Sequence, residues 1–392
     1  FPTRRSSDLI FKMRRVVFIK SNLLPISEVF IKEQVLALQN WTPILMGENY
    51  VYDGLDLTGI DTIIYNQSQS YFNKKMNKIR DLLYCYNSKM FSSLKKINPD
   101  IIHAQFATDG VKYWPTIKKL NKPLVVHLRG NDITIYKEHW YKQSNFSMKL
   151  YPRRLLEMSK SDKVHFVAVS EAIRQRAIEY GLPKEKIRTI YSGIDLDKFP
   201  VTEIPMIKRP LKILFVGRLI EKKGIMYLLK AFKEVLKEIP QAKLVIAGNG
   251  KLFGEAQDFS VQNNLQVEFL GAITHAEVQN ELQTTRIFCL PSICAKNGNR
   301  EGLPNVIKEA QLSGIPVVTS AFGGKTEGII DGETGFSFME KDILTLKEYL
   351  IKLLKDDLLS QSMAEKAVAF ARERFDMKKC TSNLETFYDS LM

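Results

Sequence analysis

Residues 301–309 read E-G-L-P-N-V-I-K-E, and this stretch narrows the choice of fold more than any other in the chain. Pro304 suits the first turn of a helix, where its missing N–H costs nothing. A helix is therefore predicted to begin here, and the amides and dipole at its N-terminus favour an anion from Asn305 onward. Glu301 would precede the helix and Glu309 would lie further along it. The stretch thus places one acid on each side of a site suited to phosphate.

Glycines and charged residues flank this stretch in a definite order. Upstream, residues 216–224 read V-G-R-L-I-E-K-K-G. Downstream, residues 314–319 read G-I-P-V-V-T, residues 323–327 read G-G-K-T-E, and residues 331–335 read D-G-E-T-G. In this order and spacing, the set resembles the family 4 retaining glycosyltransferases of GT-B architecture. The resemblance covers nearly the whole chain from Met13 and is most specific in the C-terminal half.

Short apolar segments alternate with helical segments along the chain, which indicates layers of parallel strands and helices. Helices are predicted at residues 28–38, 171–180 and 225–238. Thr274 and Glu277 form a capping box for a further helix. Strands are predicted at residues 15–20, 101–104, 124–128, 164–169, 187–191, 213–216, 243–247, 267–270, 287–290 and 316–319.

This alternation and the resemblance predict an α/β fold of the GT-B class, with two Rossmann-like doubly wound domains facing each other across a cleft. Ligands bind such sheets at the carboxyl ends of their strands. Residues 195–209 contain two prolines and no periodic segment, so we place the interdomain linker there. An N-terminal, acceptor-side domain is expected at residues 13–200 and a C-terminal, nucleotide-sugar-binding domain at residues 201–375. The resemblance implies that a last helix, at residues 376–392, crosses back onto the first domain.

The composition is that of a globular protein, with 392 residues, 45% of them hydrophobic and 26% charged. The sequence has no secretory signal pattern and no apolar run of about 18 residues, the length that would predict a membrane span. Residues 1–12 have neither strand nor helix periodicity and are interpreted as a non-native tail, so a chain that begins at Met13 is expected to fold and melt as the full chain does. Free thiols in a reducing cytosol are expected for the four cysteines, Cys85, Cys289, Cys294 and Cys380.

The positive charge of the chain is concentrated in its N-terminal half. Residues 1–200 hold 32 Lys+Arg and 19 Asp+Glu, whereas the remainder holds 25 and 24. This asymmetry suggests an anionic partner for the first half, although a basic surface also serves solubility alone. Residues 71–100 carry seven basic and two acidic residues, with apolar residues at helical spacing. Such a helix lies either on an anionic membrane or inside its domain.

Nucleic acid is not expected as a partner, because the basic residues form no recognisable binding module. The resemblance favours the membrane alternative, because polysaccharide glycosyltransferases extend lipid-linked acceptors. It implies a cytoplasmic protein that is peripheral at the inner face of the plasma membrane.

Arg218 and Lys223 follow a predicted strand and a glycine turn, and both cations suit the oxygens of a diphosphate. Lys222 is interpreted as a surface lysine. The resemblance implies that Arg218 and Lys223 bind the donor diphosphate, Glu309 the nucleotide ribose and Glu301 the donor sugar. It extends this donor set to Leu303, Pro304, Asn305 and Val306, with Gly324 and Glu327 as further candidates. For Glu327 the alternative is a glutamate placed by the dipole of a helix N-terminus.

Residues 127–132 read H-L-R-G-N-D directly after a predicted strand. Similar enzymes carry H-G-x-D there, with the histidine near the reacting sugar. When Gly130 and Asp132 are aligned with that pattern, Arg129 takes the place of the histidine and His127 lies two residues earlier. Residues 127 and 129 share one face of a strand, so either side chain could point into the cleft. Arg129, His127, Asp132 and Glu301 form the predicted catalytic set, although His127 could also be a core histidine.

The expected activity follows from the resemblance. A nucleotide diphosphate sugar donates its sugar to a hydroxyl of a glycan or lipid-linked acceptor, and the leaving phosphate accepts the proton. Residues 26–31 read I-S-E-V-F-I, which resembles the S-E-T-F-I segment of colanic acid and amylovoran enzymes. A role in bacterial exopolysaccharide biosynthesis is therefore expected. The alternatives are an epimerase or phosphorylase on the same fold, and a non-catalytic scaffold that binds nucleotide-sugars.

No cofactor and no metal are expected. The chain lacks a D-x-D motif and a cluster with metal-ligand spacing. An ATP-binding loop at residues 323–326 is disfavoured, because residue 319 is a threonine where that motif requires glycine.

Overall fold

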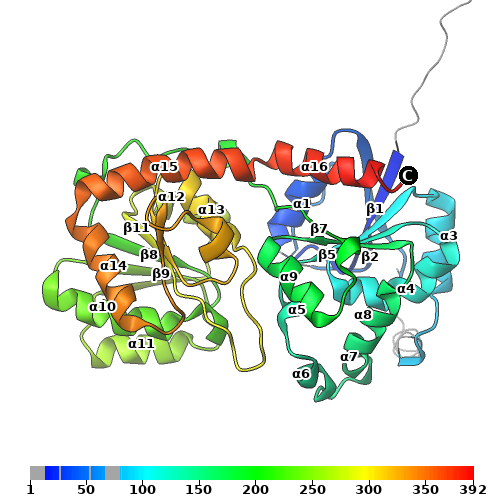
Figure 1. Cartoon of the computed structure of the whole chain (residues 1–392), viewed down its shortest axis with the longest axis horizontal. Coiled ribbons are helices and arrows are strands. Elements are labelled where there is room, and N and C mark those ends of the chain that lie inside the picture. Colours follow the sequence, from blue (N-terminus) through cyan, green and yellow to red (C-terminus); the bar gives the residue numbers. More distant parts are fainter. Residues whose placement is uncertain (1–13, 26–27, 53, 67–79, 81) are drawn as a thin grey trace, which may run out of the picture.

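The computed structural model describes residues 14–25, 28–52, 54–66, 80 and 82–392. The predicted tail at residues 1–12 lies outside the described residues, as do residues 71–79 and 81 of the basic segment predicted at residues 71–100. Two α/β domains lie side by side, and a pair of helices at the C-terminus runs along one edge of both (Figure 1). Within the described ranges, every helix is too short or too polar to span a lipid bilayer.

The N-terminal domain is built on a parallel sheet that has seven strands among the described residues, in the order β3-β2-β1-β4-β5-β6-β7. The strands are β1 (Arg14–Leu23), β2 (Trp41–Tyr50), β3 (Thr62–Ile64), β4 (Ile101–Ala104), β5 (Leu124–Leu128), β6 (Val164–Ala168) and β7 (Ile187–Thr189). Its described helices are α1 (Val29–Leu36), α3 (Ser88–Ile97), α4 (Ala107–Leu120), α5 (Asn131–Thr134), α6 (Lys137–Tyr141), α7 (Phe146–Lys149), α8 (Tyr151–Ser159) and α9 (Glu171–Tyr180). The sequence pattern did not predict β2 or β3, because Pro43 and Gly47 interrupt the apolar run of β2 and β3 is only three residues long.

The C-terminal domain repeats this plan with six parallel strands among the described residues, in the order β10-β9-β8-β11-β12-β13. The strands are β8 (Lys212–Val216), β9 (Lys243–Ala247), β10 (Val267–Gly271), β11 (Ile287–Leu290), β12 (Val317–Thr319) and β13 (Gly335–Ser337). The helices are α10 (Ile225–Glu238), α11 (Phe253–Gln262), α12 (His275–Gln283), α13 (Asn305–Leu312) and α14 (Ile343–Lys355). The predicted α/β class, with two Rossmann-like domains, is confirmed.

The strand order reverses once in each sheet, between β1 and β4 and between β8 and β11. At such a reversal the connections leave toward opposite faces of the sheet, so a crevice forms at the carboxyl ends of the two strands. The residues that follow β1 and β4 in one domain, and β8 and β11 in the other, are therefore placed to bind ligands.

Local sequence signals set several helix boundaries. Helices α9 and α10 begin and end where the sequence predicts. The Ser170 hydroxyl accepts a hydrogen bond from the Ile173 amide at 3.1 Å, and Gly181 ends α9 in the left-handed region with φ 107°. The capping box of Thr274 and Glu277 is confirmed at the start of α12. Helix α1 is shorter than predicted, spanning Val29–Leu36.

The last two helices, α15 (Asp357–Phe375) and α16 (Met377–Asp389), connect the domains. The backbone of Ile194 forms hydrogen bonds with the last residue of α15 and the first residue of α16. The Ile194 amide donates to the Phe375 carbonyl at 2.8 Å, and the Met377 amide donates to the Ile194 carbonyl at 3.1 Å. The chain leaving the N-terminal domain is thereby bound to the point at which the chain returns to it.

Helix α16 packs on the N-terminal domain through a buried apolar face. Leu384 and Tyr388 are fully buried in one cluster with Val16 and Phe18 of β1. The carboxylate of Glu385 accepts hydrogen bonds from the three consecutive amides of residues 39–41, at 2.8, 2.7 and 3.2 Å. Apolar burial and these charge-assisted bonds together hold the helix on the domain.

Truncating this face should destabilise the protein. Leu384→Ala removes a fully buried side chain and should lower the free energy of unfolding by about 2–5 kcal/mol. The control is Leu358→Ala on α15, because Leu358 is 85% exposed. Urea unfolding of both variants checks the prediction, and equal midpoints would contradict the packing of α16.

Candidate functional site

The turn after β8 is held against the end of β11 by Gly224. This residue has φ 70°, and a Cβ atom on it would lie 1.7 Å from the carbonyl oxygen of Pro291, so only glycine fits. The short helical turn before it, at Glu221–Lys223, is therefore fixed beside the carboxyl edge of the sheet. Lys223 folds back over Gly217, where a Cβ atom added to the glycine would lie 3.5 Å from Nζ.

Glu301 forms ion pairs with two lysines of this turn. Its Oε1 lies 2.9 Å from Nζ of Lys222 and its Oε2 lies 3.4 Å from Nζ of Lys223. Each of the three side chains is only 12% exposed. The interpretation of Lys222 as a surface lysine is wrong, because its side chain is only 12% exposed and pairs with Glu301, which lies in a loop far away in the sequence.

Burial and charge oppose each other in this cluster. Burial by itself raises the pKa of Glu301, but Lys223 and Lys222 outweigh it and bring the pKa to about 2. Burial lowers the pKa of Lys223, and Glu301 acts against that change. Glu301 is thus a carboxylate at neutral pH.

Arg218 differs from its neighbours because it is exposed and its guanidinium has no hydrogen bond or ion pair within the described ranges. It follows the same strand end as Lys223. A guanidinium in this position is available to oxygens of a ligand.

Helix α13 begins at Asn305, with Pro304 at the N-cap, as predicted. The amides of Asn305 and Val306 have no acceptor among the described residues. The Leu303 side chain packs in the core of the C-terminal domain, so this residue offers its backbone alone to a ligand. Glu301 thus pairs with the basic turn, and the free amides follow it closely in the chain, an arrangement that suits an anion bearing hydroxyl groups.

Glu309, on the same helix, is 7% exposed and lies 3.6 Å from Nε2 of His275. Hydrogen bonding to Glu309 raises the pKa of His275 against the effect of burial. The sequence pattern gives no sign that His275 and Glu309 meet, because they lie in separate helices.

Glu327 lies in a short π-helical turn, Gly324–Gly328, but its carboxylate reaches the other domain. It accepts hydrogen bonds from the amides of Glu171 and Ala172, at 2.7 and 2.8 Å, and from the Tyr191 hydroxyl at 3.0 Å. The acid thus binds the N-terminus of α9, where the helix dipole favours it. This contact favours the helix-dipole alternative, with the helix supplied by the facing domain.

A second contact between the domains lies beside the loop that carries Glu301. The amide of Tyr136 donates to the carbonyl of Asn297 at 2.9 Å. A Cβ on Gly130 would lie 3.8 Å from the carbonyl oxygen of Arg300 and 4.0 Å from the amide of Gly302. The turn after β5 therefore touches the segment that presents Glu301.

The predicted catalytic residues of the N-terminal domain are bound mainly to their own domain. Strand β5 ends at Leu128, so the shared strand face expected for residues 127 and 129 does not form. His127 is fully buried and stacks on His103, with Nδ1 3.2 Å from Nε2 of that residue. Burial lowers the pKa of both histidines well below the usual range, so both are neutral.

Arg129 is half-buried and donates to Gln105, Ser192 and Gln34, with distances of 3.2, 3.2 and 3.0 Å. Burial lowers its pKa to about 9. Asp132 is 2% exposed, and its carboxylate accepts from the amides of Ala107 and Gly130 at 3.1 and 2.9 Å. These bonds fix the turn after β5 on the start of α4.

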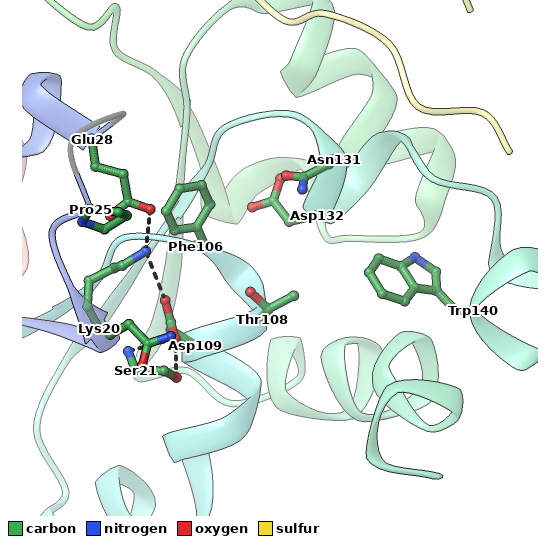
Figure 2. A pocket seen from close by; sticks show the side chains of 11 residues that line it. Lys20, Ser21, Pro25, Glu28, Phe106, Thr108, Asp109, Asn131, Asp132 and Trp140 are labelled. Carbon is green, nitrogen blue, oxygen red and sulfur yellow. Dashed lines mark hydrogen bonds and ion pairs between the residues drawn. The ribbon is translucent and has the colours of Figure 1, made fainter. Parts of the chain in front are cut away.

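A cavity of about 310 Å³ opens at the strand reversal of this domain (Figure 2). Sequence reasoning missed it, because its walls come from segments far apart in the chain. It is lined by Lys20, Ser21, Asn22, Pro25, Glu28, Phe106, Thr108, Asp109, Asn131, Asp132 and Trp140.

Two family models match the chain in succession. Residues 65–198 match Glycosyltransferase Family 4, and residues 202–370 match Glycosyl transferases group 1. The amylovoran biosynthesis glycosyltransferase AmsK of Erwinia amylovora is 30% identical over 58% of this chain and 56% of its own length. The putative colanic acid biosynthesis glycosyltransferase WcaL of Salmonella typhimurium is 28% identical over 53% of this chain and 50% of its own length. The chain thus spans about half the length of these two relatives.

Solved structures match the whole arrangement of the two domains. Anabaena Alr3699/HepE, crystallised in complex with UDP, has a TM-score of 0.74 at 20% identity, covering 96% of this chain and 100% of that one. Sucrose-phosphate synthase from Thermosynechococcus elongatus has a TM-score of 0.75 at 17% identity, covering 96% and 99%. The expected GT-B fold is confirmed.

Acid should weaken the ion pairs of Glu301. The pKa of Glu301 is about 2 in the folded chain against an ordinary value of 4.5, so the stabilisation is fully present above pH 4.5 and is lost as the pH falls through about 2. At neutral pH it is on the order of 3 kcal/mol. Urea unfolding of the wild type and of Glu301→Gln should therefore show a stability difference that shrinks below about pH 4.5. A difference that stays constant down to the lowest accessible pH would contradict the assignment.

Proposed function

We propose that this chain, a member of the family 4 glycosyltransferases, transfers a sugar from a nucleotide diphosphate donor to a hydroxyl group of a glycan. We place the reaction in bacterial surface-polysaccharide synthesis, which the similarity to AmsK and WcaL supports. The observation that carries the proposal is the ion pair of Lys223 with Glu301, which joins the turn that bears the exposed Arg218 to the loop that leads into the free amides of α13.

The donor diphosphate is proposed to lie between the turn after β8 and the N-terminus of α13. Arg218 would bind phosphate oxygens with its planar guanidinium, and Lys223 would add a point charge. The amides of Asn305 and Val306 would complete the anion site. These groups gain most as negative charge develops on the leaving diphosphate, so they favour departure over ground-state binding.

The sugar and the ribose are proposed to lie on either side of the diphosphate. Glu301, held ionised by two lysines, would accept hydrogen bonds from hydroxyls of the donor sugar. Glu309 would accept from the ribose, with His275 beside it. Gly324 is proposed to contact the donor through its backbone alone; a Cβ atom there would lie 2.6 Å from Cδ1 of Ile307, so glycine packs this turn against α13.

Retention of anomeric configuration fits a same-face displacement in which the leaving phosphate takes the proton of the acceptor hydroxyl. The N-terminal domain then needs no protein base. Neutral His127 and hydrogen-bonded Arg129 and Asp132 would hold the wall of the cleft in shape. The bonds from Glu327 to α9 would keep the domains closed and exclude water from the donor.

Removing either cation of the proposed diphosphate site should slow sugar transfer more than the control substitution does. Arg218→Ala and Lys223→Ala should each weaken catalysis by about 2–4 kcal/mol in kcat/KM, because each removes a donor to developing charge. The control is Lys233→Ala, an exposed lysine on α10. The assay follows sugar transfer from a panel of UDP-, GDP- and ADP-sugars to hydroxyl acceptors.

Several outcomes of that assay would refute the proposal. Unchanged kcat/KM in the Arg218→Ala/Lys223→Ala double variant would refute the assignment of these residues to the diphosphate site. Interconversion of nucleotide-sugars without an acceptor would indicate an epimerase, and binding without turnover would indicate a scaffold. Independence from metal stays a prediction, and loss of transfer in EDTA that Mn²⁺ or Mg²⁺ restores would show it to be wrong.

The acceptor is proposed to be lipid-linked and presented at an anionic membrane by the basic N-terminal domain. The described part of this domain exposes Tyr141 and Phe146 next to Lys142 and Lys149, a combination suited to a lipid interface. Each lysine or arginine near such a surface adds about 1 kcal/mol.

Binding to vesicles of phosphatidylglycerol should therefore be strong at low salt and weak at high salt. The triple variant Lys74→Glu/Lys75→Glu/Lys78→Glu, in the basic segment, should stay in the supernatant after co-sedimentation. The matched control is Lys230→Glu/Lys233→Glu/Lys237→Glu on α10 of the C-terminal domain, which should pellet as the wild type does. Equal pelleting of both variants would mean that the basic segment does not contact lipid.

A further inference from the structure

The buried cluster of Glu301, Lys222 and Lys223 contains one residue, Lys222, to which the proposed donor site gives no role. Its side chain is only 12% exposed, and lysine is almost never buried unless it is paired. Its carbonyl oxygen accepts a hydrogen bond at 2.9 Å from the amide of Ile293, which follows the end of β11. The backbone and the side chain of Lys222 thus both attach the turn after β8 to the segment that leads from β11 to Glu301.

The two lysines approach different oxygens of the Glu301 carboxylate. Nζ of Lys222 lies 2.9 Å from Oε1, whereas Nζ of Lys223 lies 3.4 Å from Oε2. The closer ion pair is therefore the one with Lys222. Oε1 is buried and has no aligned hydrogen bond within the described ranges, so Lys222 acts on it mainly through its charge.

The cluster carries an excess of positive charge. Glu301 is ionised, because Lys223 and Lys222 outweigh the effect of burial and bring its pKa to about 2. One carboxylate and two ammonium groups leave a net charge of +1, at a place where water screens charges weakly. Without Lys222 the sum would be zero, and a diphosphate would meet a Lys223 that Glu301 has already neutralised.

Lys223 is the member of the cluster that lies toward the exposed Arg218. A Cβ atom on Gly217 would lie 3.5 Å from Nζ of Lys223, and Gly217 directly precedes Arg218. If Lys223 turned from Glu301 to phosphate oxygens, the carboxylate would still need a cation, because an unpaired buried charge is strongly unfavourable. Lys222 is already in place to be that cation.

We propose that Lys222 is a positioning residue that neutralises Glu301, so that the charge of Lys223 is available to the donor diphosphate. The proposal rests on the proposed function and deepens it by dividing the work between two adjacent lysines. Lys223 binds phosphate, whereas Lys222 contacts only the protein and holds the carboxylate on its Oε1 side. The argument concerns the two phosphates alone, so it applies to any nucleoside diphosphate.

The test measures the binding of nucleoside diphosphates, so it does not depend on transfer. UDP, GDP and ADP are titrated calorimetrically into the full chain at one fixed salt concentration. These probes carry no sugar, so a lost contact between Glu301 and a sugar does not affect the result. Lys222→Met should weaken binding of the probe that the wild type prefers by about tenfold or more, which corresponds to about 1.4 kcal/mol. Lys222→Arg keeps the charge and should bind more tightly than Lys222→Met.

The decisive variant is Lys222→Met/Glu301→Gln. Its affinity should return close to that of the wild type, because the neutral amide no longer neutralises Lys223 and the net charge is again +1. Lys223→Met/Glu301→Gln has the same net charge but lacks the phosphate contact, so it should stay weak. The matched control for the substitution itself is Lys233→Met, at an exposed position on α10, which should bind as the wild type does.

A loss of stability is separated from a loss of affinity by the design of the titration. Lys222→Met leaves a buried carboxylate with one partner fewer, so a lower melting temperature is expected. Each variant is therefore titrated well below its own melting transition. The calorimetric stoichiometry then gives the fraction of folded protein, and the dissociation constant refers to that fraction alone.

The proposal is overturned if Lys222→Met binds the probe as tightly as the wild type, which would leave Lys222 a role in stability alone. It is equally overturned if Lys222→Arg is as weak as Lys222→Met, or if adding Glu301→Gln fails to restore binding, since a direct contact between Lys222 and phosphate would not be restored. The proposed function fails separately: no nucleoside diphosphate then binds the wild type, and the role of Lys222 falls with it.

Discussion

The buried contact of Glu301 with Lys222 and Lys223 holds the proposed donor site together. It joins the turn after β8 to the loop that begins α13, so two separate segments present their polar groups to one place. Three charges with only 12% exposure would be costly if any one lacked its partner, because an unpaired buried charge is strongly unfavourable. The same pairing leaves Arg218 as the exposed cation of this turn. The cluster therefore fixes the geometry of the site and leaves one strong donor free for a ligand.

Contacts between the domains place the two strand reversals opposite each other. Glu327 of the C-terminal domain binds the first amides of α9, and the turn after β5 touches the loop of Glu301. Helix α16 holds the C-terminus on the N-terminal domain through Leu384, Tyr388 and Glu385. The contacts between the domains near the cleft are thus a few hydrogen bonds, separate from the buried apolar face of α16.

The sequence predicted the features that local chemistry controls. Pro304 set the start of α13, Gly181 set the end of α9, and Thr274 with Glu277 capped α12. The alternation of strands and helices was sufficient for the fold class. The strands β2, β3 and β13 were not predicted, because β2 has no continuous apolar pattern and β3 and β13 are only three residues long.

Features that depend on long-range contacts were not predictable from the pattern. Lys222 looked like any exposed lysine until the fold brought Glu301 to it. Arg129 follows its strand where similar enzymes have a histidine, but only the structure reveals that Gln34, Gln105 and Ser192 already bind its guanidinium. The cavity between Glu28 and Trp140 has no local signature, because its walls meet only when β1, β4 and β5 pair in one sheet.

The most direct test of the donor site is a crystal structure of the protein with UDP. We expect the diphosphate to lie within hydrogen-bond distance of the Arg218 guanidinium, of Nζ of Lys223 and of the first amides of α13, with the ribose on Glu309. A diphosphate bound elsewhere, with Arg218 and Lys223 still in their present positions, would contradict it.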